Sequence, residues 1–316
     1  KINIDDQSLQ QIIKYCPNLN TLAVDRTLSP GVITTLAQRA LFLPLALPVP
    51  EDSTLHLNTL HLSTHYETAA TILYNVSPKY LQSLYIDCGE EEDGVWKPLL
   101  RLVGSAAQLQ ALSLETDDEE RDTMPVLLQL LSLCPQLRHL SLADASLTEV
   151  NLNAITSSVK ELKILNLSGS NCDDEQLAHF VEHCKSTLEE LYIYNCNDIT
   201  DEGLNAALES CTKLHTLYFT CNEDMRPDSD LLANLTTIHV QCVPKCLAVL
   251  MSDLRQATSL QQLGLFTPDL SMTSVAPLAT CTTLREVRVC CNKSRTAKEQ
   301  DALVTRLSSQ LPAVDV

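Results

Sequence analysis

Apolar residues recur along the chain in one pattern, in which an aliphatic residue is followed three and five positions later by two more. Residues 188–193, LEELYI, show the pattern clearly. It occurs eleven times, and successive copies begin 21 to 38 residues apart. The copies begin at Leu19, Leu57, Leu81, Leu109, Leu137, Leu162, Leu188, Leu214, Leu235, Leu260 and Leu284. Because chance does not produce this regularity, the sequence predicts a repeat architecture.

Each copy predicts the same two elements. The alternating L-x-L part predicts a short strand whose aliphatic side chains point inward and whose intervening side chains point outward. A turn follows, and then a stretch such as residues 201–211, DEGLNAALESC, places apolar side chains at helical spacing. Asp201 is expected to cap this helix, and Glu202 is favourably placed in its first turn.

A single repeat of this kind cannot bury its apolar side without its neighbours. We therefore predict an α/β fold, a leucine-rich-repeat solenoid of about eleven repeats. It is expected to form a ribonuclease-inhibitor-like horseshoe, with a parallel sheet on the concave face and helices on the convex face. We expect one domain, residues 1–316, in which residues 1–18 end a preceding repeat and residues 290–316 form a C-terminal cap. Residues 40–54 are a proline-rich apolar insertion, which either folds back on the first repeats or is exposed for a partner.

The thirteen cysteines recur at similar repeat positions instead of clustering. Cys134 and Cys211 each lie three residues before the first leucine of the next repeat, and Cys16 and Cys281 do the same. Cys184 lies four residues before Leu188. This distribution predicts buried free thiols in a reducing compartment, the cytoplasm or the nucleus.

The charge and hydropathy of the chain limit its partners. A net charge of −18 argues against a phosphate-binding surface for nucleic acid and favours a neutral or basic protein partner. No apolar run approaches the ~20 residues that span a bilayer, so we expect no membrane partner.

Two acidic runs, residues 87–94 and 115–122, follow equivalent strands of adjacent repeats. They are either solvated loops or an acidic rim that meets a basic partner or weakly binds a divalent cation. The rim would contain Asp87, Glu90, Glu91, Glu92, Asp93, Glu115, Asp117, Asp118, Glu119, Glu120 and Asp122.

Candidate metal and catalytic motifs are incomplete. His179 and His183 have the i, i+4 spacing of zinc ligands, and Cys242 and Cys246 are spaced closely enough to share a metal, but neither pair has further ligands nearby in sequence. The phosphate-binding loop, the nucleophile elbow and the dinucleotide fingerprint do not occur. We therefore predict no enzymatic activity, no metal and no cofactor.

Outward-facing strand positions change character along the chain. They are small and polar in repeats four to six, and tyrosines gather in repeats seven and eight. Aromatic side chains are favoured on any pleated surface, but they are also favoured at interfaces. Because the repeat leaves these positions free, we predict that partner-binding residues lie here. They are Tyr192, Tyr194, Tyr218, Thr220, His239, Gln241 and Phe266.

Three segments, CPNLNTL at 16–22, CPQLRHL at 134–140 and CNDITDEGL at 196–204, resemble the cysteine-containing leucine-rich repeats of F-box/LRR and AMN-type proteins. In that family the repeats select a substrate for ubiquitination, and an F-box binds a Skp-type adaptor. No F-box occurs in the chain; either one precedes Lys1 or none exists. The resemblance implies the substrate-binding region of an SCF-type ubiquitin ligase. The alternative is an adaptor or inhibitor of a basic protein, unrelated to ubiquitin.

Overall fold

The computed structural model describes most of the repeat region. The described residues are 19–24, 56–63, 69, 72–74, 76–88, 96–116, 124–221, 226–267, 277–278 and 281–291. They belong to two compact units, unit 1 with Lys1–Leu142 and Asn153–Leu162, and unit 2 with Ala143–Leu152 and Lys163–Val316. The expected segments at 1–18 and 40–54 lie outside the described residues, as does the expected cap beyond residue 291. The organisation as one domain stays a prediction.

Unit 1 contains five parallel strands that pair in chain order. They are β1 (Thr21–Val24), β2 (Thr59–Ser63), β3 (Ser83–Cys88), β4 (Ala111–Thr116) and β5 (His139–Ser141). The helical elements of the unit include η2 (Pro78–Tyr80), α4 (Trp96–Ser105) and α5 (Met124–Ser132). Helix α6 (Glu149–Ser158) contributes residues to both units.

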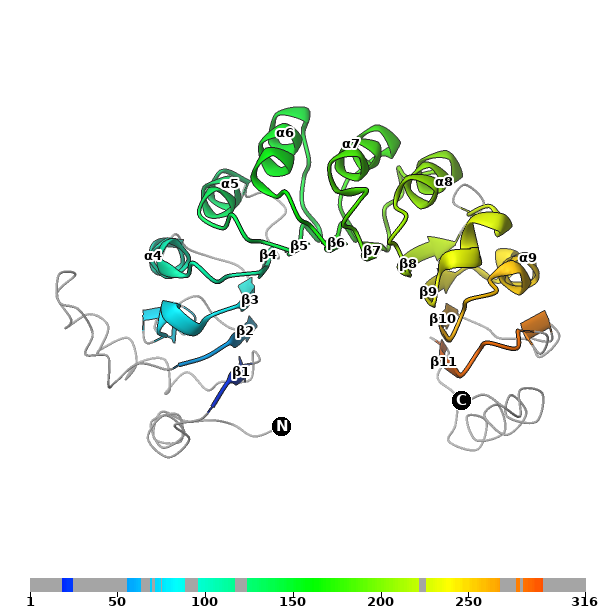
Figure 1. The fold of residues 1–316 in the computed structure, drawn as a ribbon, viewed down its shortest axis with the longest axis horizontal. Coiled ribbons are helices and arrows are strands. Elements are labelled where there is room, and N and C mark those ends of the chain that lie inside the picture. The colour runs from blue at the N-terminus through cyan, green and yellow to red at the C-terminus, as the bar shows by residue number, and fades with distance from the viewer. Residues whose placement is uncertain are drawn as a thin grey trace. The chain divides into compact units, whose positions relative to one another are not determined.

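Unit 2 contains six further strands in chain order. They are β6 (Ile164–Asn166), β7 (Glu190–Ile193), β8 (Thr216–Cys221), β9 (Thr237–Cys242), β10 (Gln262–Thr267) and β11 (Glu286–Cys291), and neighbours pair in parallel. The helical elements between them are α7 (Asp174–Cys184), α8 (Asp201–Ser210), η3 (Ser229–Asn234), α9 (Pro244–Asp253) and η4 (Leu254–Gln256). These lie along one face of the sheet (Figure 1). We call the opposite face of the unit 2 sheet the helix-free face.

The aliphatic residues of the repeat form the core. In unit 2, each strand aligns the second aliphatic residue of its repeat with that of the next, as in the pairs Leu165–Leu191 and Leu191–Leu217. All three of these side chains are fully buried. Along β7, buried and half-buried residues alternate, as the L-x-L pattern predicts. Burying each such leucine stabilises the fold by about 2 kcal/mol relative to exposure.

The turn after the strand has a recurring left-handed residue. Asp144, Gly169 and Asn195 occupy equivalent places in three successive repeats, with φ of 57°, 73° and 54°. Asn, Asp and Gly are the residues that tolerate this conformation best. The next residue after Asn195 is Cys196, which is buried and whose thiol donates to the Leu167 carbonyl oxygen at 3.0 Å. The turn thereby returns the chain toward the core.

The start of α8 corrects one expectation. Thr200, not Asp201, is the N-cap, and its hydroxyl accepts a hydrogen bond from the Glu202 amide at 3.3 Å. Asp201 is the first helical residue and is exposed. Sequence reasoning misplaced the cap by one residue because aspartate and threonine are both good caps. Helix α7 begins with a complete capping box between Asp173 and Gln176.

Asp174 ties consecutive repeats together. Its carboxylate accepts hydrogen bonds from the Thr200 amide at 2.8 Å and from the Thr200 hydroxyl at 2.6 Å. Gly203 makes room for this contact, because a Cβ there would lie 2.0 Å from the Asp174 Oδ1 atom. The side chain that begins α7 therefore also fixes the beginning of α8.

The cysteines pack as small apolar side chains. Cys134, Cys184 and Cys211 are buried and free, as the sequence predicts for the residue that precedes a new strand. Burial raises the pKa of Cys134 to about 12 and the pKa of Cys211 to about 11. These thiols stay protonated at neutral pH, which suits a packing role.

We predict that Asp174→Ala lowers the free energy of unfolding by about 2 kcal/mol, because two hydrogen bonds to a carboxylate are lost and Thr200 is left without them. Glu175→Ala is the matched control, since Glu175 is an exposed acid in the same first turn. It should cost about 0.5 kcal/mol through the helix dipole alone. Urea unfolding measures both variants. Equal losses would show that the Asp174–Thr200 contact contributes nothing.

Candidate functional site

One row of outward-facing residues crosses five strands of unit 2. Strand register places Tyr192 beside Tyr218, and Tyr218 beside His239. The row continues through Gly264 to Arg288. Because alternate strand residues face the same side, all five lie on the helix-free face. Neighbouring residues of this row are 21 to 26 positions apart in sequence, so they meet only because the repeats stay in register.

Three rings of this row form a continuous stack. The Tyr192 and Tyr218 rings have centroids 4.0 Å apart and are nearly parallel, at 10°. The Tyr218 and His239 rings follow at 4.3 Å and 5°. Stacked rings at such spacing attract one another beyond the area that they bury. The hydroxyl of Tyr192 donates to Glu190 Oε2 at 2.8 Å, and burial together with this bond raises the pKa of Tyr192.

A second row lies along the same face, nearer the strand ends. Tyr194 directs its ring edge-on to Tyr218, at 5.9 Å and 79°, and to Phe266, at 6.1 Å and 82°. Thr220 and Gln241 lie in this row, with Gln241 in register with both Thr220 and Phe266. We call Tyr192, Tyr194, Tyr218, His239 and Phe266 the ring cluster. The structure therefore brings together all seven residues that the sequence predicts as partner-binding.

Exposure varies across the ring cluster. Phe266 is 40% exposed, although it is a large apolar side chain, and Gln241 beside it is exposed as well. The other four rings are half-buried, because they cover one another. The hydroxyl of Thr220 accepts a hydrogen bond from the Asn195 amide at 2.9 Å, and this bond connects the second row to the left-handed turn at Asn195.

Tyr194 contains the one unusual polar atom of the cluster. Its hydroxyl is buried, yet no protein group in the described residues bonds to it. Burial raises the pKa of Tyr194, so the hydroxyl stays protonated at neutral pH. A buried hydroxyl without a partner costs free energy.

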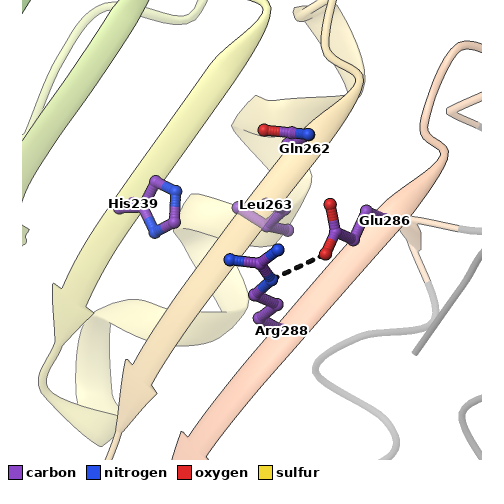
Figure 2. A pocket seen from close by; sticks show the side chains of 5 residues that line it. All are labelled: His239, Gln262, Leu263, Glu286 and Arg288. Atoms are coloured by element: carbon purple, nitrogen blue, oxygen red, sulfur yellow. Dashed lines mark hydrogen bonds and ion pairs between the residues drawn. The ribbon is translucent and has the colours of Figure 1, made fainter. Parts of the chain in front are cut away.

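The far end of the row contains charge. Arg288 Nε donates to Glu286 Oε1 at 2.6 Å, and the two residues lie two positions apart on β11. Figure 2 shows His239, Gln262, Leu263, Glu286 and Arg288 around a small hollow above β10. Burial lowers the pKa of His239, and the nearby Arg288 charge lowers it further. The imidazole is therefore neutral at pH 7.

The predicted acidic rim is only partly described. Asp87 and Glu115, which begin the two acidic runs, are register partners on β3 and β4 of unit 1. The Asp87 carboxylate accepts a hydrogen bond from the Ser63 hydroxyl at 2.7 Å. The acids at 90–93 and 117–122 lie outside the described residues. The rim stays a prediction.

Neither candidate metal pair gains a complete ligand set. His179 and His183 contact each other on α7, with ring centroids 4.7 Å apart. Cys242 acquires a neighbour that spacing did not reveal, since strand register places Cys221 opposite it and a hydrogen bond from Cys242 lowers the pKa of Cys221. Among the described residues, no group of three or more His, Cys, Asp or Glu is arranged to hold a metal ion. In the same part of the chain, no helix is both long and apolar enough to cross a membrane.

Comparisons with known proteins identify the architecture. No protein-family model matches the chain, and no curated protein matches its sequence. The structure is similar to the leucine-rich-repeat-containing protein LegL7 of Legionella pneumophila, with a TM-score of 0.54 and 12% identity over 94% of this chain and 99% of LegL7. The fold is a leucine-rich-repeat solenoid. A chain of the yeast Rad7–Elc1 complex is also similar, with a TM-score of 0.64 and 16% identity over 98% of this chain and 78% of that chain.

These similarities extend to the fold and no further. At 12% and 16% identity, an outward-facing residue is not transferable from either structure to this one. The leucine-rich-repeat assignment from the sequence is thus confirmed, and the F-box/LRR subfamily is not.

We predict opposite effects for two tyrosine substitutions. Tyr194→Phe removes a buried hydroxyl that has no partner, so the free energy of unfolding should stay unchanged or rise by up to about 1 kcal/mol. Tyr192→Phe removes the hydrogen bond to Glu190, so the free energy of unfolding of this variant should fall by about 1 kcal/mol. Chemical unfolding of both variants measures the difference. A loss for Tyr194→Phe as large as that for Tyr192→Phe would show that the Tyr194 hydroxyl has a stabilising partner.

Proposed function

We propose that the chain is a non-catalytic protein-recognition scaffold that binds a protein partner on the helix-free face of unit 2. The observation that carries this proposal is the ring cluster. The repeat requires aliphatic residues at the buried strand positions and leaves the outward positions free. Five rings nevertheless gather at those free positions and contact one another.

The chemistry of the cluster favours binding over catalysis. Tyr192 and Tyr194 have raised pKa values, so neither serves as a base or nucleophile at neutral pH. His239 is neutral, and its ring is stacked on Tyr218. Rings that are held by one another lose little freedom when a partner arrives, which makes them effective contact residues.

A finer proposal concerns the assembly. We propose that the repeats are the substrate-binding region of an SCF-type ubiquitin ligase, located in the cytoplasm or nucleus. The support is the cysteine-containing repeat pattern, together with the structural similarity to a chain of the yeast Rad7–Elc1 complex. That complex joins two proteins, and its similarity to this chain lies in the fold.

A second candidate is an adaptor or inhibitor that binds a basic protein without any ubiquitin ligase. Its support is electrostatic. The net charge is −18, and the two acidic runs begin at the register partners Asp87 and Glu115. Opposite charges on a partner would raise its association rate and make binding sensitive to salt.

Affinity capture from a lysate of the source cells tests the binding face. Captured proteins are quantified by mass spectrometry for wild type, for the Tyr192, Tyr194 and Tyr218→Ala triple variant, and for Gln241→Arg. Gln241 is exposed, so its substitution adds bulk and charge without disturbing the core. Ala178→Arg, at an exposed position of α7, is the matched control. We expect at least one partner to fall about tenfold or more in both face variants and to persist in the control. An unchanged set of partners would contradict the proposal.

Copurification tests the ligase assignment separately. We expect the protein isolated from its source cells to copurify with a Skp-type adaptor. If the isolated protein retains its partner, but neither copurifies with a Skp-type adaptor nor supports ubiquitination of that partner, the adaptor or inhibitor candidate is favoured. In that case binding should weaken steeply with salt, because screening reduces an acidic surface's attraction for a basic protein.

A further inference from the structure

The stacked row is interrupted at one position, Gly264. Each neighbouring strand contributes a side chain to this row, but β10 contributes none. The missing side chain is replaced by His239, because a Cβ at residue 264 would lie 2.1 Å from His239 Nδ1 and 2.8 Å from its Cε1. Because residue 264 is glycine, the imidazole of His239 on β9 extends over β10 and occupies the space that a side chain at residue 264 would fill.

A second flat group faces this space from the other side. Arg288 on β11 is the register partner of Gly264, and Figure 2 shows its guanidinium directed over β10 toward His239. Its Nε atom is held by Glu286, which fixes one edge of the group. The Arg288 side chain is otherwise 73% exposed, so its guanidinium is accessible to a guest.

Among the described residues, one face of the His239 ring is covered by an aromatic ring and the other is not. Tyr218 stacks on the first face at 4.3 Å. In the described residues, no aromatic ring stacks on the second face, which is the face toward Arg288. The spacing of 4.0 and 4.3 Å along the stack defines where a fourth ring would lie. An added ring there would contact an imidazole on one side and a guanidinium on the other.

The charges around the hollow favour a neutral guest. The guanidinium is already paired with Glu286, so a carboxylate guest would meet the negative charge of that residue. His239 has a lowered pKa and offers no second positive charge. A cationic guest would be repelled by Arg288 itself. An aromatic ring, in contrast, is attracted to a cation without bearing a charge.

The rim of the hollow also supplies polar groups. Gln262 is exposed and lies at one side, and the second carboxylate oxygen of Glu286 lies at another. Both are acceptors within the lining of the hollow, and they suit a guest that has a hydroxyl or an N–H at its tip. Tyrosine and tryptophan are the side chains that combine a ring with such a donor.

We propose that the hollow between His239 and Arg288 receives a tyrosine or tryptophan side chain of the bound protein, which extends the Tyr192–Tyr218–His239 stack by one ring. This inference rests on the proposed function, since it names the chemistry of the partner at that face. It makes Gly264 and Arg288 specificity-determining residues, although neither was among the partner-binding residues predicted from the sequence.

Side-chain analogues test the hollow directly. The probes are p-cresol for tyrosine and 3-methylindole for tryptophan, with cyclohexanol and propionate as non-aromatic and anionic controls. The histidine rings are isotopically labelled, and the His239 Cε1–H signal is assigned with a His239→Gln variant. We expect a saturable upfield shift of this signal with both aromatic probes, with a dissociation constant of about 1 mM. The two control probes should produce no saturable shift.

Three variants locate the binding. Arg288→Ala should weaken p-cresol binding about fivefold, because the cation on one face of the guest is lost. Arg255→Ala is the matched control, since Arg255 is exposed on η4, and it should bind as wild type does. Gly264→Ala should abolish the shift by displacing the imidazole. If Gly264→Ala does not fold, the comparison of Arg288→Ala with Arg255→Ala still decides the result.

The outcomes separate this inference from the proposed function. Equal shifts with cyclohexanol, equal affinities for Arg288→Ala and Arg255→Ala, or no saturable shift would overturn the ring-binding hollow. Any of these results leaves the affinity capture free to support binding elsewhere on the same face. The converse result is also possible. If aromatic probes give a saturable shift at His239, but the captured partners bind the triple tyrosine variant as they bind wild type, the proposed function is contradicted and the hollow's preference for aromatic rings is still supported. A captured partner should also bind Arg288→Ala more weakly than Arg255→Ala.

Discussion

The structure depends on the burial of one repeat's aliphatic side chains against those of the next. Within each unit, the second aliphatic residue of a repeat lies in register with its counterparts on neighbouring strands, and in unit 2 the Leu165, Leu191 and Leu217 side chains are fully buried in this way. No single repeat has a core of its own, so stability comes from contacts between neighbours. Strand register follows from the same contacts, because a slip of one residue would turn every leucine to solvent. The same register determines which outward side chains are neighbours on the helix-free face.

Much of the fold could be predicted from the sequence, because its main signal is local and repeated. The strands β1 to β11 fall on the eleven copies of L-x-x-L-x-L, and alternation assigns Tyr192 and Tyr194 to the outward side. The boundary of α8 was missed by one residue, since Thr200 and Asp201 are both acceptable caps and only the contact with Asp174 decides between them. That contact joins residues 26 positions apart, and no local pattern encodes it.

The sequence was enough to predict which residues of the candidate site face outward, but not how their side chains pack against one another. Outward positions could be listed from the sequence, and all seven predicted partner-binding residues lie on one face of unit 2. The parallel stacking of Tyr192, Tyr218 and His239 could not be inferred, because side-chain torsions depend on what neighbouring strands leave open. Gly264 and Arg288 went unselected because a glycine and a paired arginine resemble ordinary surface residues. Likewise, spacing along the chain does not reveal that Cys221 lies opposite Cys242 on the neighbouring strand.

Several outward positions on these strands contact one another, as the stacked rings of Tyr192, Tyr218 and His239 do. Residues 239 and 264 are different, because the imidazole of His239 occupies the volume that a side chain at residue 264 would fill. A larger side chain at one of these positions therefore requires a smaller side chain at the other. During divergence from an ancestor, the two positions must therefore change together or pass through an intermediate with a displaced ring. Gln241, in contrast, is exposed, so a larger side chain at residue 241 displaces no neighbour in this way.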